Sequence, residues 1–292
     1  MSTVYLNGEL IPSERAMISV DDRGFLFADG IYEVTPAYRG APFRIERHLD
    51  RMRRGLSELR IDYDPAPLVD VHQRLIAANG LEGEEVSIVY VQVTRGVAPR
   101  AHAFPTTPVR PTVYAFAKAF KRPARAVWEK GYSATTVPDR RWARADIKTI
   151  GLLPNCLALQ AAVEDGTNDA LLVRDGVALE GALNNFFAVI DGAVVTHPAT
   201  NHILHGITRE YVLELCWESG LKVEERPIQV EELARASEAF FTGTTTEVRP
   251  TVKIDGRPVG DGKVGPVATQ LQDAYLEGVE RASPPRPGDS PR

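Results

Sequence analysis

The sequence predicts two lobes that each combine helices with strands, an α/β architecture of the α+β type. A chain of 292 residues, 43% of them hydrophobic, is long enough to build two hydrophobic cores. The first half mixes segments of helical and of strand periodicity, whereas the second half carries Asp-Gly turns between apolar runs. We therefore expect a smaller N-terminal α+β lobe and a larger C-terminal α/β lobe rich in hairpins.

The N-terminal lobe is expected to contain two helices and a strand pair. Apolar residues recur at spacings of three and four over residues 46–60, which predicts an amphipathic helix. A second helix, over residues 67–80, begins at a proline and ends at a glycine. Residues 85–94 alternate β-branched side chains, and residues 112–120 read as their antiparallel continuation.

The order of the lobes along the chain follows from changes in periodicity. The segment around residues 119–130 has no clean period, so we expect an N-terminal lobe over residues 1–120 and a connection over 121–132. The segments "DALLVRDGVALEG" and "NNFFAVIDGAVVTHP" each predict a hairpin in a C-terminal lobe over residues 133–281. The tail, residues 282–292, is Pro-rich and polar, which predicts disorder.

The charge and the cysteines narrow the class of protein. The net charge is −5, so no general basic field favours nucleic acid or an anionic membrane. Cys156 and Cys216 form no CxxC motif, the N-terminal segment lacks a signal-peptide pattern, and no apolar run approaches a membrane span. We expect a cytoplasmic protein that binds small molecules.

Two motifs that suggest cofactor or metal sites are better explained as ordinary loops. "GDGKVG", residues 260–265, matches a dinucleotide fingerprint but leaves no room for a following βαβ unit, so it predicts a turn before the last helix. His197, His202 and His205 lack a cysteine or carboxylate in register, so we expect no metal.

Lys148 lies in "RRWARADIKTIGLLPN", between Asp146 and an apolar stretch that leads into a helix. An amine at such a place can be partly desolvated, and desolvation makes a lysine a better nucleophile. Taken alone, a lysine that extends from an apolar segment to solvent remains the more common interpretation.

The surrounding motifs favour the nucleophile. Glu180 ends a predicted strand, residues 206–208 open a predicted helix, and "FFTGTTTEVRP" runs from a strand into a Gly/Thr-rich turn. Helix-opening amides and threonine hydroxyls bind phosphate well. A lysine, a carboxylate and a phosphate cradle are the groups that a pyridoxal phosphate enzyme needs for the Schiff base, the pyridine nitrogen and the 5′-phosphate.

With these motifs in place, the chain resembles the class IV (fold type IV) pyridoxal-phosphate aminotransferases, and within them the bacterial D-amino-acid aminotransferases. The resemblance runs from about residue 3 to residue 280 and includes "DDRGFLFADGIYEV", "HLDRM", "QVTRGVAPRAHAFP", "DIKTIGLLPN", "EGALNNFFAV", "HPATNHILHGITR", "TGTTTEV" and "DGKVGP". It implies a two-lobed fold with pyridoxal 5′-phosphate between the lobes. It also implies a homodimer whose active sites use loops of both subunits.

The resemblance also implies roles for individual residues. Lys148 would hold the cofactor and move a proton between the substrate Cα and the cofactor. Glu180 would face the pyridine nitrogen and keep it protonated, and Arg141 would support the phenolate side of the ring. The remaining cofactor contacts would come from Arg51, Leu204, Ile207, Thr208 and Thr244, with Leu204 beneath the ring and the others at the phosphate.

The loop "TRGVAPRAHAFP" is implied to bind the substrate. Arg100 and His102 would reach across the dimer interface and join Tyr32 at the α-carboxylate, with Thr245 as a further substrate contact. A guanidinium binds a carboxylate through two parallel hydrogen bonds. Arg95, between a strand residue and Gly96, is interpreted as a structural support.

The resulting hypothesis is a D-amino-acid transaminase that transfers the amino group of a D-amino acid such as D-alanine to 2-oxoglutarate, giving a keto acid and D-glutamate. The alternatives within the fold are a branched-chain L-amino-acid transaminase, an (R)-amine transaminase and aminodeoxychorismate lyase. A cofactor-binding or dimeric structural protein without activity is a further alternative, which the presence of Lys148 and Glu180 disfavours. Relatives often have serines at Ala182, Leu183 and Gly243, and Leu183 predicts a preference for larger aliphatic D-amino acids.

Overall fold

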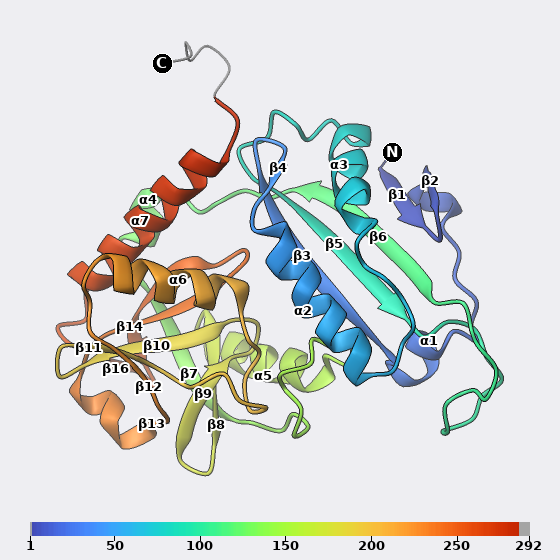
Figure 1. The fold of residues 1–292 in the computed structure, drawn as a ribbon. Coiled ribbons are helices and arrows are strands. Elements are labelled where there is room, and N and C mark those ends of the chain that lie inside the picture. Colours follow the sequence, from blue (N-terminus) through green and yellow to red (C-terminus); the bar gives the residue numbers. More distant parts are fainter. Residues whose placement is uncertain (1, 286–292) are drawn as a thin grey trace. The chain divides into compact units, whose positions relative to one another are not determined.

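The computed structural model describes residues 2–285 and contains two compact units (Figure 1). The first unit combines Ile147–Gly151 with the described parts of Met1–Lys121 and Val279–Arg292, and the second comprises Arg122–Asp146 and Leu152–Gly278. The mixture of helices and sheets confirms the predicted fold class. The exact lobe boundaries stay a prediction, and most of the predicted disordered tail, from residue 286 onward, lies outside the described residues.

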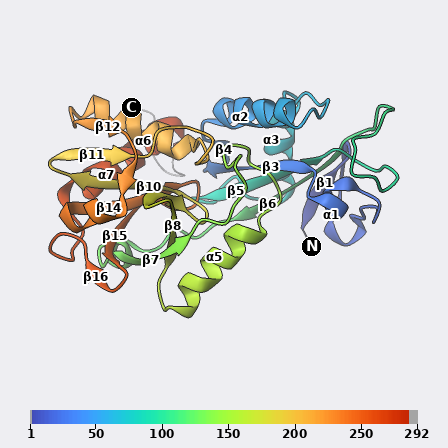
Figure 2. The ribbon, with the colours of Figure 1, turned by 90° about the horizontal axis from the view of Figure 1, so that it is seen from below.

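The first unit is built on one antiparallel sheet in the order β2-β1-β6-β5-β3-β4. Helices α2 and α3 lie on the same face of this sheet (Figure 2). The elements of the unit are β1 (Thr3–Leu6), β2 (Glu9–Pro12), the 3-10 helix η1 (Ser13–Arg15), α1 (Arg23–Phe27), β3 (Gly30–Tyr38), β4 (Ala41–Pro42), α2 (Ile45–Glu58), α3 (Leu68–Ala78), β5 (Ser87–Thr94) and β6 (Thr112–Ala119).

The periodicity of α2 explains how this unit forms its core. Its buried side chains include Leu49, Met52 and Leu56, which form one stripe and pack with Val89 and Val91 of β5. This confirms the predicted amphipathic helix. The predicted strand pair is also confirmed, because β5 and β6 are antiparallel along their whole length.

The second unit contains a closed ring of strands. Strands β10, β14, β15, β7, β8 and β9 pair in sequence, and β9 pairs back to β10. The strands of the unit are β7 (Tyr132–Pro138), β8 (Asp169–Arg174), β9 (Val177–Gly181), β10 (Asn185–Ile190), β11 (Ala193–Thr196), β12 (Val223–Glu225), β13 (Ile228–Gln229), β14 (Ala236–Gly243), β15 (Glu247–Ile254) and β16 (Arg257–Pro258). Its helices are α4 (Arg125–Trp128), α5 (Leu153–Glu164), α6 (Ile207–Glu218), the 3-10 helix η2 (Val230–Arg235) and most of α7 (Pro266–Ala282).

The turns of the second unit follow the sequence signals. The Asp-Gly pairs at 175–176 and 191–192 connect β8 to β9 and β10 to β11, and all four residues have positive φ, as a tight type I′ turn requires. Residues 260–265 form turns and bends before α7, as predicted for "GDGKVG". Among residues 2–285, each helix is too short or too polar to span a lipid bilayer.

His72 on α3 is buried in the first unit and makes its stability depend on pH. Its Nδ1 lies 2.7 Å from the Leu68 carbonyl oxygen and its Nε2 3.1 Å from the Thr35 hydroxyl. Burial lowers the pKa of His72 from 6.5 to about 4. An unfolded chain therefore binds a proton at a higher pH than the folded one, and the stabilisation present above pH 6.5 is lost as the pH falls toward 4.

We predict that the free energy of unfolding decreases by about 2 kcal/mol between pH 7 and pH 5 because of His72 alone. Urea denaturation at both pH values, compared with the His72→Gln variant, measures this difference. An equal decrease in the wild-type and variant proteins would contradict the assignment.

Candidate active site

Lys148 is held in the first unit as a short extension of its sheet. The Tyr32 amide donates to the Lys148 carbonyl at 3.0 Å, the Ile150 amide donates to the Gly30 carbonyl at 3.2 Å, and Thr149 bridges to Ile31. The preceding residue, Ile147, is part of the core of this unit. The backbone on both sides of Lys148 is therefore fixed to β3.

The Lys148 side chain lies over the Tyr32 ring. Its Nζ is 4.2 Å from the ring centroid, which is within the range of a cation–π contact. The Tyr32 ring in turn stacks on Tyr90 of β5, with centroids 5.5 Å apart. Lys148 and Tyr32, predicted to contact the cofactor and the substrate respectively, are thus in direct contact.

Arg51, the predicted phosphate ligand on α2, is bound to a buried carboxylate. Its Nε and Nη2 donate to the two Glu33 carboxylate oxygens at 2.7 Å each, and His48 Nδ1 lies 2.9 Å from Glu33 Oε2. Burial acts to raise the pKa of Glu33, but Arg51 and His48 hold it well below its usual range. Burial lowers the pKa of His48. The sequence analysis missed Glu33 and His48, although both lie inside its motifs "DGIYE" and "HLDRM".

The loop after β5 is anchored by two arginines. Arg95 donates to both carboxylate oxygens of Asp29, at 2.7 and 2.9 Å, and to the carbonyls of Leu59 and Arg60. Its interpretation as a structural support is therefore confirmed. Arg23 donates to the carbonyl of Ala101 at 2.6 Å, which fixes the far end of the loop.

Between these anchors, Arg100 and His102 meet at one aromatic ring. The Arg100 Cζ is 5.3 Å from the Phe27 centroid, and the His102 ring centroid is 5.6 Å from it. Both side chains are exposed. The structure thus brings the two predicted carboxylate ligands together on α1.

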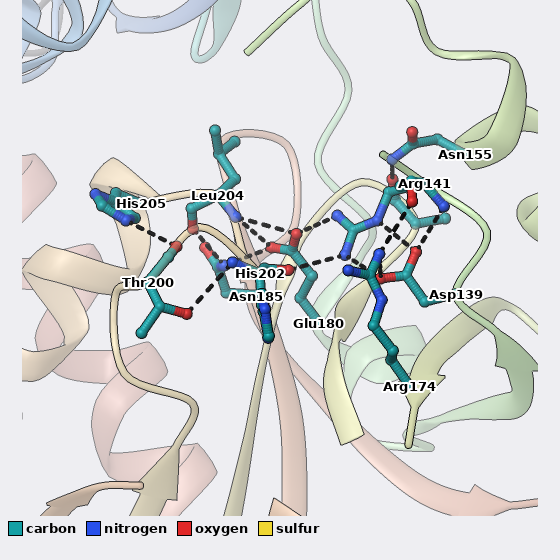
Figure 3. Close-up of polar contacts among 11 residues, drawn as sticks. Asp139, Arg141, Asn155, Arg174, Glu180, Asn185, Thr200, His202, Leu204 and His205 are labelled. Atoms are coloured by element: carbon teal, nitrogen blue, oxygen red, sulfur yellow. Dashed lines mark hydrogen bonds and ion pairs between the residues drawn. The ribbon is translucent and has the colours of Figure 1, made fainter. Parts of the chain in front are cut away.

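Glu180 is the centre of the polar network in the second unit (Figure 3). The residue is 3% exposed and lies near the end of β9. Arg141 donates to its Oε1, the Asn185 amide donates to Oε2 at 2.8 Å, and the Leu204 backbone amide donates to Oε1 at 3.0 Å. Burial raises the pKa of Glu180 to about 7, and the Arg141 guanidinium acts in the opposite direction.

Arg141 joins Glu180 to a second buried carboxylate. Its Nε and Nη2 donate to the Asp139 oxygens at 2.9 and 3.1 Å, and Arg174 Nη2 lies 2.8 Å from Asp139 Oδ2. Although burial acts to raise the pKa of Asp139, hydrogen bonds from Arg141 hold it below its usual range. The structure places Arg141 against the carboxylate predicted for the ring nitrogen, and the suggested phenolate contact stays a prediction.

The predicted phosphate cradle starts at the N-terminus of α6. Ile207 and Thr208 form its first turn, and the residue before them, Gly206, provides no side-chain cap. A Cβ at Gly206 would come within 2.0 Å of Asn185 Oδ1, so only glycine lets Asn185 reach Glu180. The backbone amides of an uncapped first turn are suited to bind an anion.

The remaining predicted residues lie on turns of the second unit. Thr244 and Thr245 form part of the turn between β14 and β15, where Thr245 is exposed and Thr244 is half-buried. At the three positions where relatives often have serines, Ala182 is buried, Gly243 is half-buried, and Leu183 is 61% exposed. An exposed Leu183 is compatible with a role in substrate preference, which stays a prediction.

The predicted residues therefore divide between the units. The first unit carries Tyr32, Arg51, Arg100, His102 and Lys148, and the second carries Glu180, Leu204, Ile207, Thr208, Thr244 and Thr245. Within residues 2–285, no three His, Cys, Asp or Glu side chains are grouped as metal ligands. His197 Nδ1 instead faces the Pro198 carbonyl at 2.8 Å, and His205 Nε2 faces the Thr200 carbonyl at 3.1 Å.

Comparisons with known proteins relate the chain to one family of enzymes. The sequence profile of the family "Amino-transferase class IV" matches residues 30–254. The D-alanine aminotransferase of Staphylococcus haemolyticus is 43% identical over 97% of this chain and 100% of its own length.

Two solved structures show the same fold. The branched-chain amino acid aminotransferase of Escherichia coli has a TM-score of 0.89 and 25% identity, covering 98% of this chain and 97% of its own. A second branched-chain amino acid aminotransferase, from T.th., was determined with pyridoxamine 5′-phosphate. It has a TM-score of 0.83 and 28% identity, covering 97% of this chain and 95% of its own.

We predict that Arg141→Met lowers the free energy of unfolding by about 3 kcal/mol, because it leaves Glu180 buried without its counter-charge. Adding Glu180→Gln should recover much of the loss, since a neutral amide needs no guanidinium. Chemical denaturation of the single and double variants measures both effects.

Arg144→Met is the matched control, because Arg144 pairs with Asp146 where its side chain is 40% exposed. We expect a loss below about 1 kcal/mol for such a pair. Equal losses for Arg141→Met and Arg144→Met would show that the buried pair has no special weight.

Proposed function

The chain belongs to the class IV aminotransferases, and we propose that it is a D-amino-acid transaminase. In the proposed reaction, a D-amino acid such as D-alanine gives its amino group to 2-oxoglutarate, which yields a 2-oxo acid and D-glutamate. The enzyme uses pyridoxal 5′-phosphate, as its class does.

The observation that carries this proposal is the contact between Lys148 and Tyr32 in the unit that also holds Arg100 and His102. The group that would move the proton and the groups that would bind the substrate carboxylate are thereby parts of one compact unit. The relative from Staphylococcus haemolyticus supports the D-specific branch, because it is much more similar in sequence than the two branched-chain enzymes.

Three features of the chain fit the cofactor. Lys148 supplies an amine, Glu180 is a buried carboxylate with three hydrogen-bond donors, and α6 begins without a side-chain cap. When bound, pyridoxal phosphate carries the amino group between the two substrates and accepts electrons from the bond broken at the substrate Cα.

We assign two tasks to the Lys148 amine. It would hold the cofactor between turnovers, and during a turnover its Nζ would take the proton from the substrate Cα and return it. The hydrogen bonds between its backbone and β3, together with the Tyr32 ring 4.2 Å away, support this role by keeping the amine in one place.

Glu180 would hold the proton of the pyridine nitrogen. Burial raises the pKa of its carboxyl to about 7, while Arg141 favours the ionised form. A protonated ring nitrogen beside it would favour the ionised carboxylate further. Arg141 is therefore proposed to act on Glu180, with Asp139 holding the guanidinium in position.

The phosphate would be bound by the first turn of α6, Thr244 and Arg51. The Ile207 and Thr208 amides lie at the positive end of the helix dipole. Glu33 binds the Arg51 guanidinium along one edge and so fixes the plane in which it can meet an anion.

The substrate carboxylate would be bound by Arg100, His102 and Tyr32, with Thr245 as a further contact. We propose a homodimer in which Arg100 and His102 of one subunit meet Tyr32 of the other. The separate contacts of these residues support that arrangement, because Arg100 and His102 pack on Phe27 whereas Tyr32 packs on Lys148.

We predict that the enzyme, mixed with D-alanine and no 2-oxo acid, releases a stoichiometric amount of pyruvate. L-alanine should release none, and Lys148→Ala should release none from either enantiomer. A lactate dehydrogenase assay measures the pyruvate. Release from L-alanine, or a preference for L-leucine or an (R)-amine, would instead favour an alternative of the same fold.

We predict that Arg100→Met lowers kcat/KM for D-alanine about 100-fold, because a charge-assisted pair with the carboxylate is lost. The absorption of the bound cofactor should not change. Arg110→Met is the control, since Arg110 lies in the same loop and donates to the Asn7 carbonyl. Equal kcat/KM values for both variants would exclude Arg100 from substrate binding.

A further inference from the structure

The turn that carries Thr244 and Thr245 is followed by a residue in an unusual backbone conformation. Glu247 has a φ of +51° at the start of β15. Asparagine and aspartate adopt this left-handed region comparatively often, whereas a glutamate there is uncommon. Such a conformation persists only where the surrounding structure enforces it.

The Glu247 side chain is held by two other segments of the second unit. Arg122, just before α4, donates from Nε to both carboxylate oxygens at 3.0 Å and from Nη2 to Oε1 at 2.8 Å. Gln272, on α7, donates from Nε2 to Oε2 at 2.9 Å. The carboxylate is almost completely buried by these contacts.

The next residue is fixed by the same segments. Gln272 Oε1 accepts from the Val248 amide at 3.0 Å, and Trp128 of α4 donates to the Val248 carbonyl at 2.7 Å. On the other side, Gly243 pairs with Glu247, and the Thr246 amide donates to the Gly243 carbonyl at 3.1 Å. The exit of the threonine turn is therefore held while its tip projects from the sheet.

We propose that Glu247 is a positioning residue for the cofactor and the substrate. Its carboxylate, bound by Arg122 and Gln272, keeps the backbone in the left-handed conformation and so fixes the turn that presents Thr244 and Thr245. The inference rests on the proposed function, which assigns Thr244 to the phosphate and Thr245 to the substrate. Ordering the turn before binding lowers the entropy lost when the ligand is bound.

The test is a titration of the apoenzyme with pyridoxal phosphate, followed by its absorption. Glu247→Gly removes the carboxylate but accepts the positive φ, so we expect the Kd to rise about tenfold. Glu247→Gln keeps the shape and hydrogen-bonding capacity of the side chain and should stay within about threefold of the wild type. Hydrogen exchange of residues 244–246 should be faster in Glu247→Gly only.

Asp255→Gly is the matched control. Asp255 has a φ of +48° beyond the other end of β15, and its carboxylate accepts from the Thr136 amide and hydroxyl. A residue with a merely structural role would behave like this control, whose Kd we expect to equal that of the wild type. Gln272→Met, which leaves Glu247 in place, is a second variant that should raise the Kd if Glu247→Gly does not fold.

Thr244→Val separates the two levels of the argument. If Thr244→Val weakens binding of pyridoxal phosphate while Glu247→Gly and Gln272→Met bind as the wild type does, the positioning role is wrong. If Thr244→Val itself binds as tightly as the wild type, the proposed phosphate contact fails and the inference fails with it.

Discussion

A carboxylate buried as deeply as Glu180 is stable only if hydrogen-bond donors replace its lost water, and the second unit is arranged to provide them. The donors come from three separate segments: Arg141 after β7, Asn185 at the start of β10, and the Leu204 amide before α6. The same requirement recurs one step outward, where Asp139 neutralises Arg141. The path of the chain around Glu180 thus follows from the cost of burying one charge.

The first unit solves a similar problem with Glu33, which binds Arg51 and His48. Both units therefore place an arginine against a buried carboxylate, so that the guanidinium has a fixed orientation before any ligand arrives. A pre-oriented group loses less conformational entropy on binding, which favours both affinity and stereochemical selection.

Features that depend on local patterns could be predicted from the sequence. The stripe of α2 and the two Asp-Gly hairpins were correct because periodicity and turn chemistry act over a few residues. The partners of the charged residues could not be predicted, since Arg51 and Glu33 are 18 positions apart and Arg141 and Glu180 are 39 apart. Only the tertiary structure brings such residues together. The resemblance supplied the identities of the site residues, whereas no local pattern indicated that Lys148 would attach to β3.

That attachment has a consequence for how the chain is divided. The backbone passes from one unit to the other after Lys121, after Asp146, after Gly151 and after Gly278. No single cut can separate the units, and an N-terminal fragment would lack the segment that carries the lysine. The two units are therefore not modules that could be exchanged by joining genes end to end. Each needs a segment that the ribosome makes only after much of the other has been synthesised.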